Sequence, residues 1–259
     1  MRQFAAALRV EARVLSALMV RELGARHGGD ASGTVWLLVE PLLVFSVVYL
    51  IHGFEVFHTT VSVPFIVILM TGYTPHLALR HAGLGGIAAL QANRGLLYHR
   101  QVHFLDVAFA RMLVETVTVL ISFTIVYFIG YVFKMLSTPY SLGYIYLGWF
   151  FNVWFIFIVG AFVTGAGLVW PLVRRIFVPW SLFMLIPYEA FSMLYWWPPY
   201  VQYYLSFFPC TNAVEITRYG YFGNAVPTIF YIGYTTECCL VLTFLGILTL
   251  YWGRRHLEL

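Results

Sequence analysis

Long apolar runs dominate this sequence and limit the folds that are open to it. Each of six runs could cross the ~30 Å hydrocarbon layer of a bilayer as a helix of about 20 residues. They cover residues 34–53, 61–80, 105–133, 142–170, 174–195 and 228–252. Only 10% of the 259 residues are charged, too few to coat a water-soluble domain. The sequence therefore predicts an all-α integral membrane protein with six transmembrane helices, in a single domain over residues 1–259.

The basic residues fall almost entirely on one side of these six spans. Lys134 and Arg218 alone are expected on the other side, on the connections after the third and fifth spans. The remaining thirteen are Arg2, Arg9, Arg13, Arg21, Arg26, Arg80, Arg94, Arg100, Arg111, Arg174, Arg175, Arg254 and Arg255. The positive-inside bias then predicts that both termini are cytoplasmic. These arginines favour a role in membrane topology over one in nucleic-acid binding.

Three segments outside the spans have distinct patterns. Residues 1–26 place their apolar side chains on one helical face and Arg2, Arg9 and Arg13 on the other, which predicts an interfacial helix within a cytoplasmic segment 1–33. Residues 81–104 are predicted to form a structured cytoplasmic loop with glycines at 83, 85 and 86. Residues 196–227 are apolar and aromatic but broken by prolines, which predicts short helices that dip into the membrane.

The sequence lacks the motifs that would supply its own chemistry. It contains no Gly-x-x-x-x-Gly-Lys-Ser/Thr phosphate loop, no His-Glu-x-x-His and no Gly-x-Ser-x-Gly. No catalytic residue and no metal site is predicted. If the protein moves a solute uphill, another subunit or an ion gradient must supply the energy.

Acidic residues within the spans are the next candidates, because a charge at that depth is costly. Glu115 lies four residues after Arg111 and is expected to pair with it along one helix. Two interpretations remain open for Glu40, Glu189 and Glu237: they form structural pairs, or they line an ion pathway. The acids appear dispersed, and no lysine or arginine falls in the middle of a predicted span.

Aromatic residues make up 19% of the chain, more than interfacial belts normally need. Many gather near the fifth span: Tyr188, Phe191, Tyr195, Trp196, Trp197, Tyr200, Tyr203 and Tyr204. They are consistent with an interfacial belt, or with a pathway whose flat rings and hydroxyls hold a sugar polymer loosely.

Three stretches together resemble the permease subunit of capsular polysaccharide exporters, a branch of the ABC-2 type transporters. The first is Arg21-Glu22-Leu23 with Arg26, Gly33, Trp36 and Glu40-Pro41; the second is Ala92-Asn93-x-Gly95-Leu96 with Arg100, Val102, Asp106, Ala110-Arg111 and Glu115-Thr116. The third is Pro209 with Glu215 and Arg218. Phe208 and Asn212 depart from the third pattern, in which asparagine and often histidine occupy these places.

The resemblance implies a homodimer in a bacterial inner membrane, with two cytoplasmic ABC ATPase subunits that bind the ATP and Mg²⁺. This chain would hold no cofactor itself. Its cargo would be a lipid-linked polysaccharide, passed to a periplasmic adaptor of the polysaccharide co-polymerase type and an outer-membrane channel. Segment 81–104 would couple to the ATPase, and segment 196–227 would form a periplasmic gate.

The resemblance also assigns candidate residues to each part. ATPase coupling would fall to Gln91, Asn93, Arg94, Leu96 and Arg100, and the cytoplasmic mouth to Arg21, Arg26, Trp36 and Glu40. The substrate path and gate would use Tyr188, Tyr195, Trp196, Trp197, Tyr200, Tyr203, Tyr204, Glu215 and Arg218. Within the same class, the cargo could instead be O-antigen, teichoic acid or a small drug. In another class, the chain would be an intramembrane enzyme acting on lipid-linked sugar, with Glu40, Glu189 or Glu215 as acid or base.

Overall fold

The computed structural model describes residues 2–25, 63–93, 104–134 and 136–256, together with residues 39, 42, 43, 46, 47 and 50. Every regular element in these ranges is helical. Three of the helices are long and apolar enough to cross a membrane: α5 (Phe104–Val132), α6 (Leu142–Val169) and α10 (Ile232–Arg254). They confirm an all-helical membrane protein and match the predicted third, fourth and sixth spans within a few residues. Most of the predicted first span lies outside the described residues.

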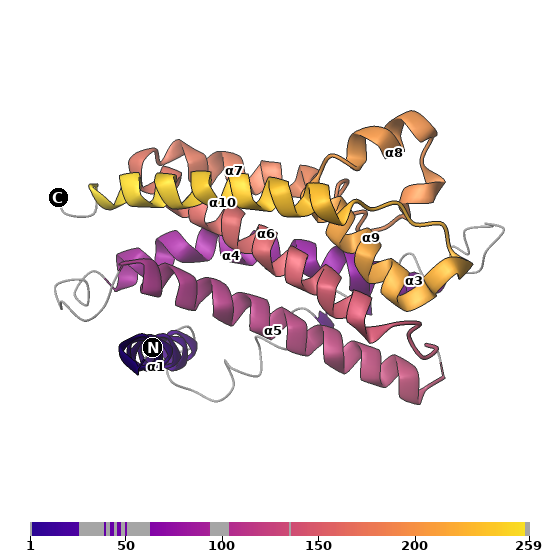
Figure 1. Cartoon of the computed structure of the whole chain (residues 1–259), viewed down its shortest axis with the longest axis horizontal. Coiled ribbons are helices and arrows are strands. Elements are labelled where there is room, and N and C mark those ends of the chain that lie inside the picture. Colours follow the sequence, from indigo (N-terminus) through magenta and orange to yellow (C-terminus); the bar gives the residue numbers. More distant parts are fainter. Residues whose placement is uncertain are drawn as a thin grey trace.

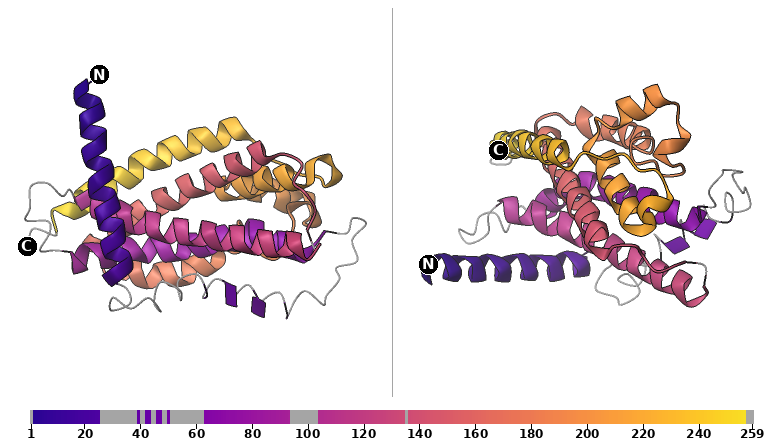
Figure 2. Two further views of the ribbon diagram at one scale, coloured as in Figure 1. Left: turned by 90° about the horizontal axis from the view of Figure 1, so that it is seen from below. Right: turned by 45° about the vertical axis from the view of Figure 1, so that its right-hand side comes forward.

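Helices α4, α5, α6 and α10 run side by side along the length of the molecule, and several short helices gather at one end of it (Figure 1). Helix α1 (Arg2–Ala25) lies crosswise to them and packs against α5, at the end where α10 finishes (Figure 2). The prediction that this helix lies at the membrane interface stays a prediction. The opposite end carries α8 (Pro199–Leu205) and α9 (Pro209–Phe222).

The second predicted span belongs to a helix longer than expected. It begins with α3 (Phe65–Ile68), passes through the π-helical turn η1 (Leu69–Tyr73) and continues as α4 (Thr74–Ala92). The prediction of a loop was therefore wrong over residues 81–86, while the helix-like run expected from Ile87 to Gln91 is the last part of α4. The glycines at 83, 85 and 86 are buried within α4, where larger side chains would collide with Phe177, Arg111 and Thr164. Residues 94–103 lie outside the described part.

The predicted fifth span, residues 174–195, is not one helix. Helix α7 (Leu172–Phe183) has 12 residues and contains Pro179. At 1.5 Å per residue it is only ~18 Å long, short of the hydrocarbon thickness. The chain then turns through residues 184–191 and enters η3 (Leu194–Trp196). Segment 196–227 consists of short helices as predicted: the end of η3, then α8, α9 and η4 (Gly223–Ala225).

Helix α6 lies at the centre and approaches two neighbours at backbone distance. At one end, Gly165 faces the main chain of α10 at Thr249 and Leu250, and Gly253 of α10 faces it in return. At the other end, a Cβ atom on Gly148 would lie 2.7 Å from the Ala213 carbonyl of α9. Small residues allow such close approach between membrane helices.

Candidate functional site

Arg218 on α9 is fully buried and fully hydrogen-bonded. Its Nη1 donates to the Glu189 carboxylate and lies 3.3 Å from Oε1 of Glu215. Its Nε donates to the hydroxyl of Thr71 on η1 at 3.1 Å, and its Nη2 donates to the carbonyls of Glu189 and Ser192 at 2.9 Å each. These residues are called the α9 cluster below. Because one cation serves two carboxyls, removal of the cation would leave buried charge uncompensated.

The α9 cluster corrects one prediction and adds to another. Arg218 was expected on the exterior side, within the short helices of segment 196–227, and its side chain there has 0% exposure. The acids were expected to be dispersed, yet Glu189, after α7, and Glu215, on α9, meet at one guanidinium nitrogen. Only the spacing of Glu215 and Arg218 by three residues along one helix could have indicated the cluster from the sequence. Glu237, in contrast, is exposed on α10, and Glu40 lies outside the described residues.

Two unusual backbone conformations flank Arg218. Glu189 has a φ of 48°, in the left-handed region that non-glycine residues rarely adopt. Thr71 belongs to the π-helical turn η1, a conformation frequent at functional sites. The next residue, Gly72, packs against the main chain on both sides of Glu189, where a Cβ atom would lie 2.6 Å from the Tyr188 carbonyl. The arginine therefore joins the strained backbone at Glu189 to a π-helical turn from a different part of the chain.

The same cluster fixes the chain that leads into α10. Glu215 Oε2 accepts a hydrogen bond from the Ile229 amide at 3.1 Å, and Asn212 Oδ1 accepts one from the Tyr231 amide at 2.7 Å. The side-chain amide of Asn212 donates to the Ser206 carbonyl at 2.6 Å and the Phe208 carbonyl at 3.1 Å. Asn212 thus joins the α8–α9 connection to the start of α10, although it departs from the family pattern.

The predicted aromatic residues do not form one surface. Tyr188 is fully buried and meets the His76 ring edge-on, with centroids 5.8 Å apart. Tyr195, Trp196 and Trp197 are half-buried around η3. The exposed members are all on α8: Tyr200, Tyr203 and Tyr204. Among the predicted aromatic residues, the tyrosines of α8 are therefore the ones that lie at the surface of the chain.

A second buried cluster lies near the crosswise helix α1. Arg111 and Glu115 on α5 pair at 3.1 Å, which confirms the prediction from their spacing. The structure adds two partners that the sequence did not indicate. Arg111 also binds Glu22 of α1, and His81 of α4 lies 3.8 Å from Glu115. This α5 cluster joins α1, α4 and α5 at the end of the molecule opposite α8 and α9 (Figure 2).

The residues expected to couple to an ATPase begin at the end of α4. Gln91 is exposed, and Nη1 of Arg174 lies 3.5 Å from its side-chain oxygen. Asn93 is buried and closes the helix by donating to the Ala89 carbonyl at 2.8 Å. Arg21 is exposed on α1. The other predicted coupling and mouth residues lie outside the described part: Arg26, Trp36, Glu40, Arg94, Leu96 and Arg100.

Known proteins similar to this chain match it over nearly its whole length. A capsule polysaccharide export inner-membrane protein of Neisseria meningitidis serogroup A, CtrC, is 33% identical over 251 residues, which are 94% of this chain and 92% of CtrC. The protein of the same description from Haemophilus influenzae, BexB, is 30% identical over 245 residues, again 94% and 92%. The polysialic acid transport protein KpsM of Escherichia coli is 24% identical over 252 residues, 92% of each chain.

No protein-family model matches the chain. The similarity to CtrC and BexB nevertheless extends over almost the whole length of this chain and of each relative. The described helices are those of a membrane protein, as both descriptions require. The chain therefore belongs to the family of capsule polysaccharide export inner-membrane proteins.

Proposed function

We propose that the chain is the permease of an ABC exporter that moves lipid-linked capsule polysaccharide across the inner membrane, while a separate subunit hydrolyses ATP. The observation that carries this proposal is the 33% identity to CtrC over 94% of the chain. The three membrane-capable helices support it as well. The acids of the α9 cluster do not favour the alternative of an intramembrane enzyme, because both carboxyls are buried and contact Arg218.

The finer architecture is part of the same proposal. Two copies of a six-span subunit would form the transport unit, with α1 on the cytoplasmic surface and α8 and α9 at the periplasmic gate. The crosswise position of α1, far from α8 and α9, supports this orientation. Two ATPase subunits would bind beneath the end of α4, and the adaptor and outer-membrane channel would continue the path outside.

We infer that α4 carries the motion from the ATPase to the gate. Helix α4 is continuous with η1. His81, on α4, contacts the α5 cluster, and Thr71, on η1, belongs to the α9 cluster. Ten residues separate these positions along the chain, or ~15 Å along a helix axis. A tilt of the α4 end that faces the ATPase would therefore displace the Thr71 hydroxyl that Arg218 binds. Because Arg218 also binds the carbonyls of Glu189 and Ser192, that segment would move as well.

The test is export by cells whose only copy of the chain carries a charge reversal. Arg94→Glu or Arg100→Glu should trap polymer in the cytoplasm and weaken recovery of the ATPase with the purified permease, because both arginines belong to the proposed docking segment. Arg255→Glu is the matched control: the same charge change at an exposed arginine near the end of α10 should leave export intact. Normal export by both test variants, in protein present at normal levels, would contradict the proposal.

A further inference from the structure

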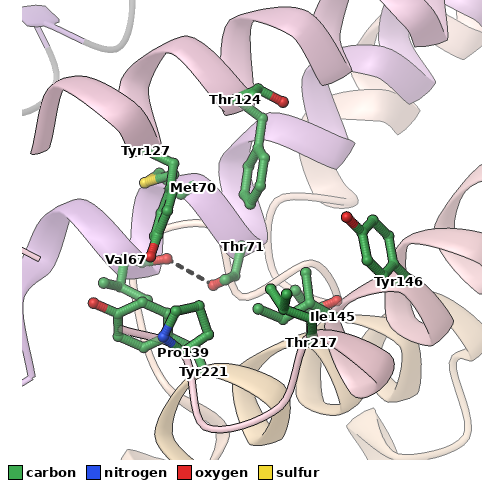
Figure 3. A pocket seen from close by; sticks show the side chains of 12 residues that line it. Val67, Met70, Thr71, Thr124, Tyr127, Pro139, Ile145, Tyr146, Thr217 and Tyr221 are labelled. Atoms are coloured by element: carbon green, nitrogen blue, oxygen red, sulfur yellow. Dashed lines mark hydrogen bonds between the residues drawn. The ribbon is translucent and has the colours of Figure 1, made fainter. Parts of the chain in front are cut away.

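A cavity of about 250 Å³ lies between η1, α5, α6 and α9 (Figure 3). Its walls are the apolar side chains of Val67, Met70, Phe123, Leu142 and Ile145, with threonines and tyrosines between them. Thr71, which accepts the hydrogen bond from Arg218 Nε, also lines it. The cavity is therefore adjacent to the α9 cluster but is not part of the aromatic segment on α8.

Most of the hydroxyl groups around this cavity already bind the protein. Thr71 donates to the Val67 carbonyl at 2.8 Å, the contact drawn in Figure 3, and Thr217 donates to the Ala213 carbonyl at 2.9 Å. Thr124 donates to the Leu120 carbonyl at 2.9 Å. The Tyr221 hydroxyl accepts the Ser137 amide at 3.1 Å. A sugar placed here would lose its hydrogen bonds to water and find few replacements, so the lining favours an apolar guest.

The cavity lies at membrane depth and reaches the protein surface. Thr124 and Tyr146, on facing sides of it, are exposed side chains of two membrane-capable helices. Helix α5 has 29 residues, so it is ~44 Å long and exceeds the hydrocarbon layer by ~14 Å. With this excess shared equally, ~7 Å of α5 extends beyond the hydrocarbon at each end. Thr124 lies eight residues, or ~12 Å, before the end of α5, and therefore ~5 Å inside the hydrocarbon.

We propose that this cavity binds an acyl chain of a bilayer phospholipid. An empty apolar cavity is unfavourable, and water fills one poorly where most of the polar groups are already bonded within the protein. The apolar molecules available at this depth are the lipid chains. The bound acyl chain would pack against Thr71 and so support the hydroxyl group that accepts the hydrogen bond from Arg218. This inference goes beyond the proposed function and depends on neither the cargo nor the ATPase.

The test uses the full chain in vesicles of phosphatidylethanolamine and phosphatidylglycerol that contain a phosphatidylcholine with a photoactivatable diazirine on one acyl chain. After irradiation, adducts are mapped by mass spectrometry. We expect labelling at Met70 and Tyr146 to exceed several-fold that at Phe244, which is 68% exposed on α10 and reports ordinary contact with lipid.

The variant Thr124→Trp places a large side chain at the exposed edge of the cavity and should reduce labelling of Met70 at least fivefold. Val117→Trp is the matched control, since Val117 is also exposed on α5, two turns away, and does not line the cavity. Labelling of Phe244 should be equal in all three proteins, which shows that each is folded in the bilayer. Absent or uniform labelling, labelling unchanged by Thr124→Trp, or protection of Met70 by a soluble oligosaccharide would overturn the proposal.

Discussion

Arg218 has an unusual environment for an arginine, because its charged side chain is fully buried. It makes five polar contacts from a position with no exposed surface. A buried arginine is stable only while its partners compensate for the hydration that it has lost. The loss of stability on changing Arg218 or one of its partners therefore depends on how much buried charge is left without a partner.

Arg218→Met should be the most damaging change in the α9 cluster, because it leaves two buried carboxyls without a cation. We expect a loss of about 3–5 kcal/mol of stability, measured as earlier thermal aggregation of the purified protein. Glu215→Gln should cost much less, since the Glu189–Arg218 pair is retained and the amide keeps its shape. Equal destabilisation by the two variants would contradict this account of the charges.

Gly72 permits a backbone contact that no other residue allows. In Gly72→Ala the new Cβ atom would lie 2.6 Å and 2.7 Å from the carbonyls of Tyr188 and Glu189, and main-chain atoms cannot rotate away as a side chain would. We expect a loss of about 1–3 kcal/mol from this overpacking, again read from thermal aggregation. Gly233→Ala is the control, because a Cβ atom there has no neighbour within 4 Å and should not lower the stability.

At the level of helices, α1 depends on Glu22 for its place on α5. Both side chains of the Glu22–Arg111 pair are only 13% exposed, so water screens the contact little. In Glu22→Ala we expect the backbone amides of α1 to exchange with deuterium roughly tenfold faster, as a loss of about 1.5 kcal/mol predicts. The exposed neighbour Arg21, changed to Ala, should leave exchange in α1 unaltered. Equal acceleration in both variants would mean that the pair does not hold α1.

The helices that could be predicted from the sequence are those with uniform apolar composition. Helices α5, α6 and α10 follow directly from runs long enough to span a bilayer. Helix α7 could not be delimited in this way, because the turns from Met184 to Phe191 are as apolar as a helix. Glycines in α4 suggested a loop, whereas they make room for Phe177 and Arg111.

The candidate site was predictable only where its residues are close in the chain. Arg111 and Glu115 are four residues apart on one helix, and their pairing is confirmed. Arg218 lies 29 residues from Glu189 and 147 from Thr71, and only the folded arrangement of η1, α7 and α9 brings them together. Periodicity along a single helix carries no information about such contacts.

For the whole molecule, the proposed orientation predicts which surfaces face the cytoplasm. Lys134 and Arg175 are both exposed, at opposite ends of the long helices. With a membrane-impermeant maleimide, Lys134→Cys should be labelled in intact spheroplasts and Arg175→Cys only in inverted vesicles. The unsubstituted chain, with its three cysteines, gives the background. The reverse pattern would place α1 outside and exclude contact between α4 and an ATPase in the cytoplasm.

The backbone contacts of α6 have a mechanical consequence for any movement of this protein. At Gly165 and Gly253 main chain meets main chain, so no rotamer change can let α6 and α10 slide past each other. Gly148 joins α6 to α9 in the same manner. The three helices are therefore expected to move as one rigid unit, so that a tilt of α6 at Gly165 would displace α9 at Gly148.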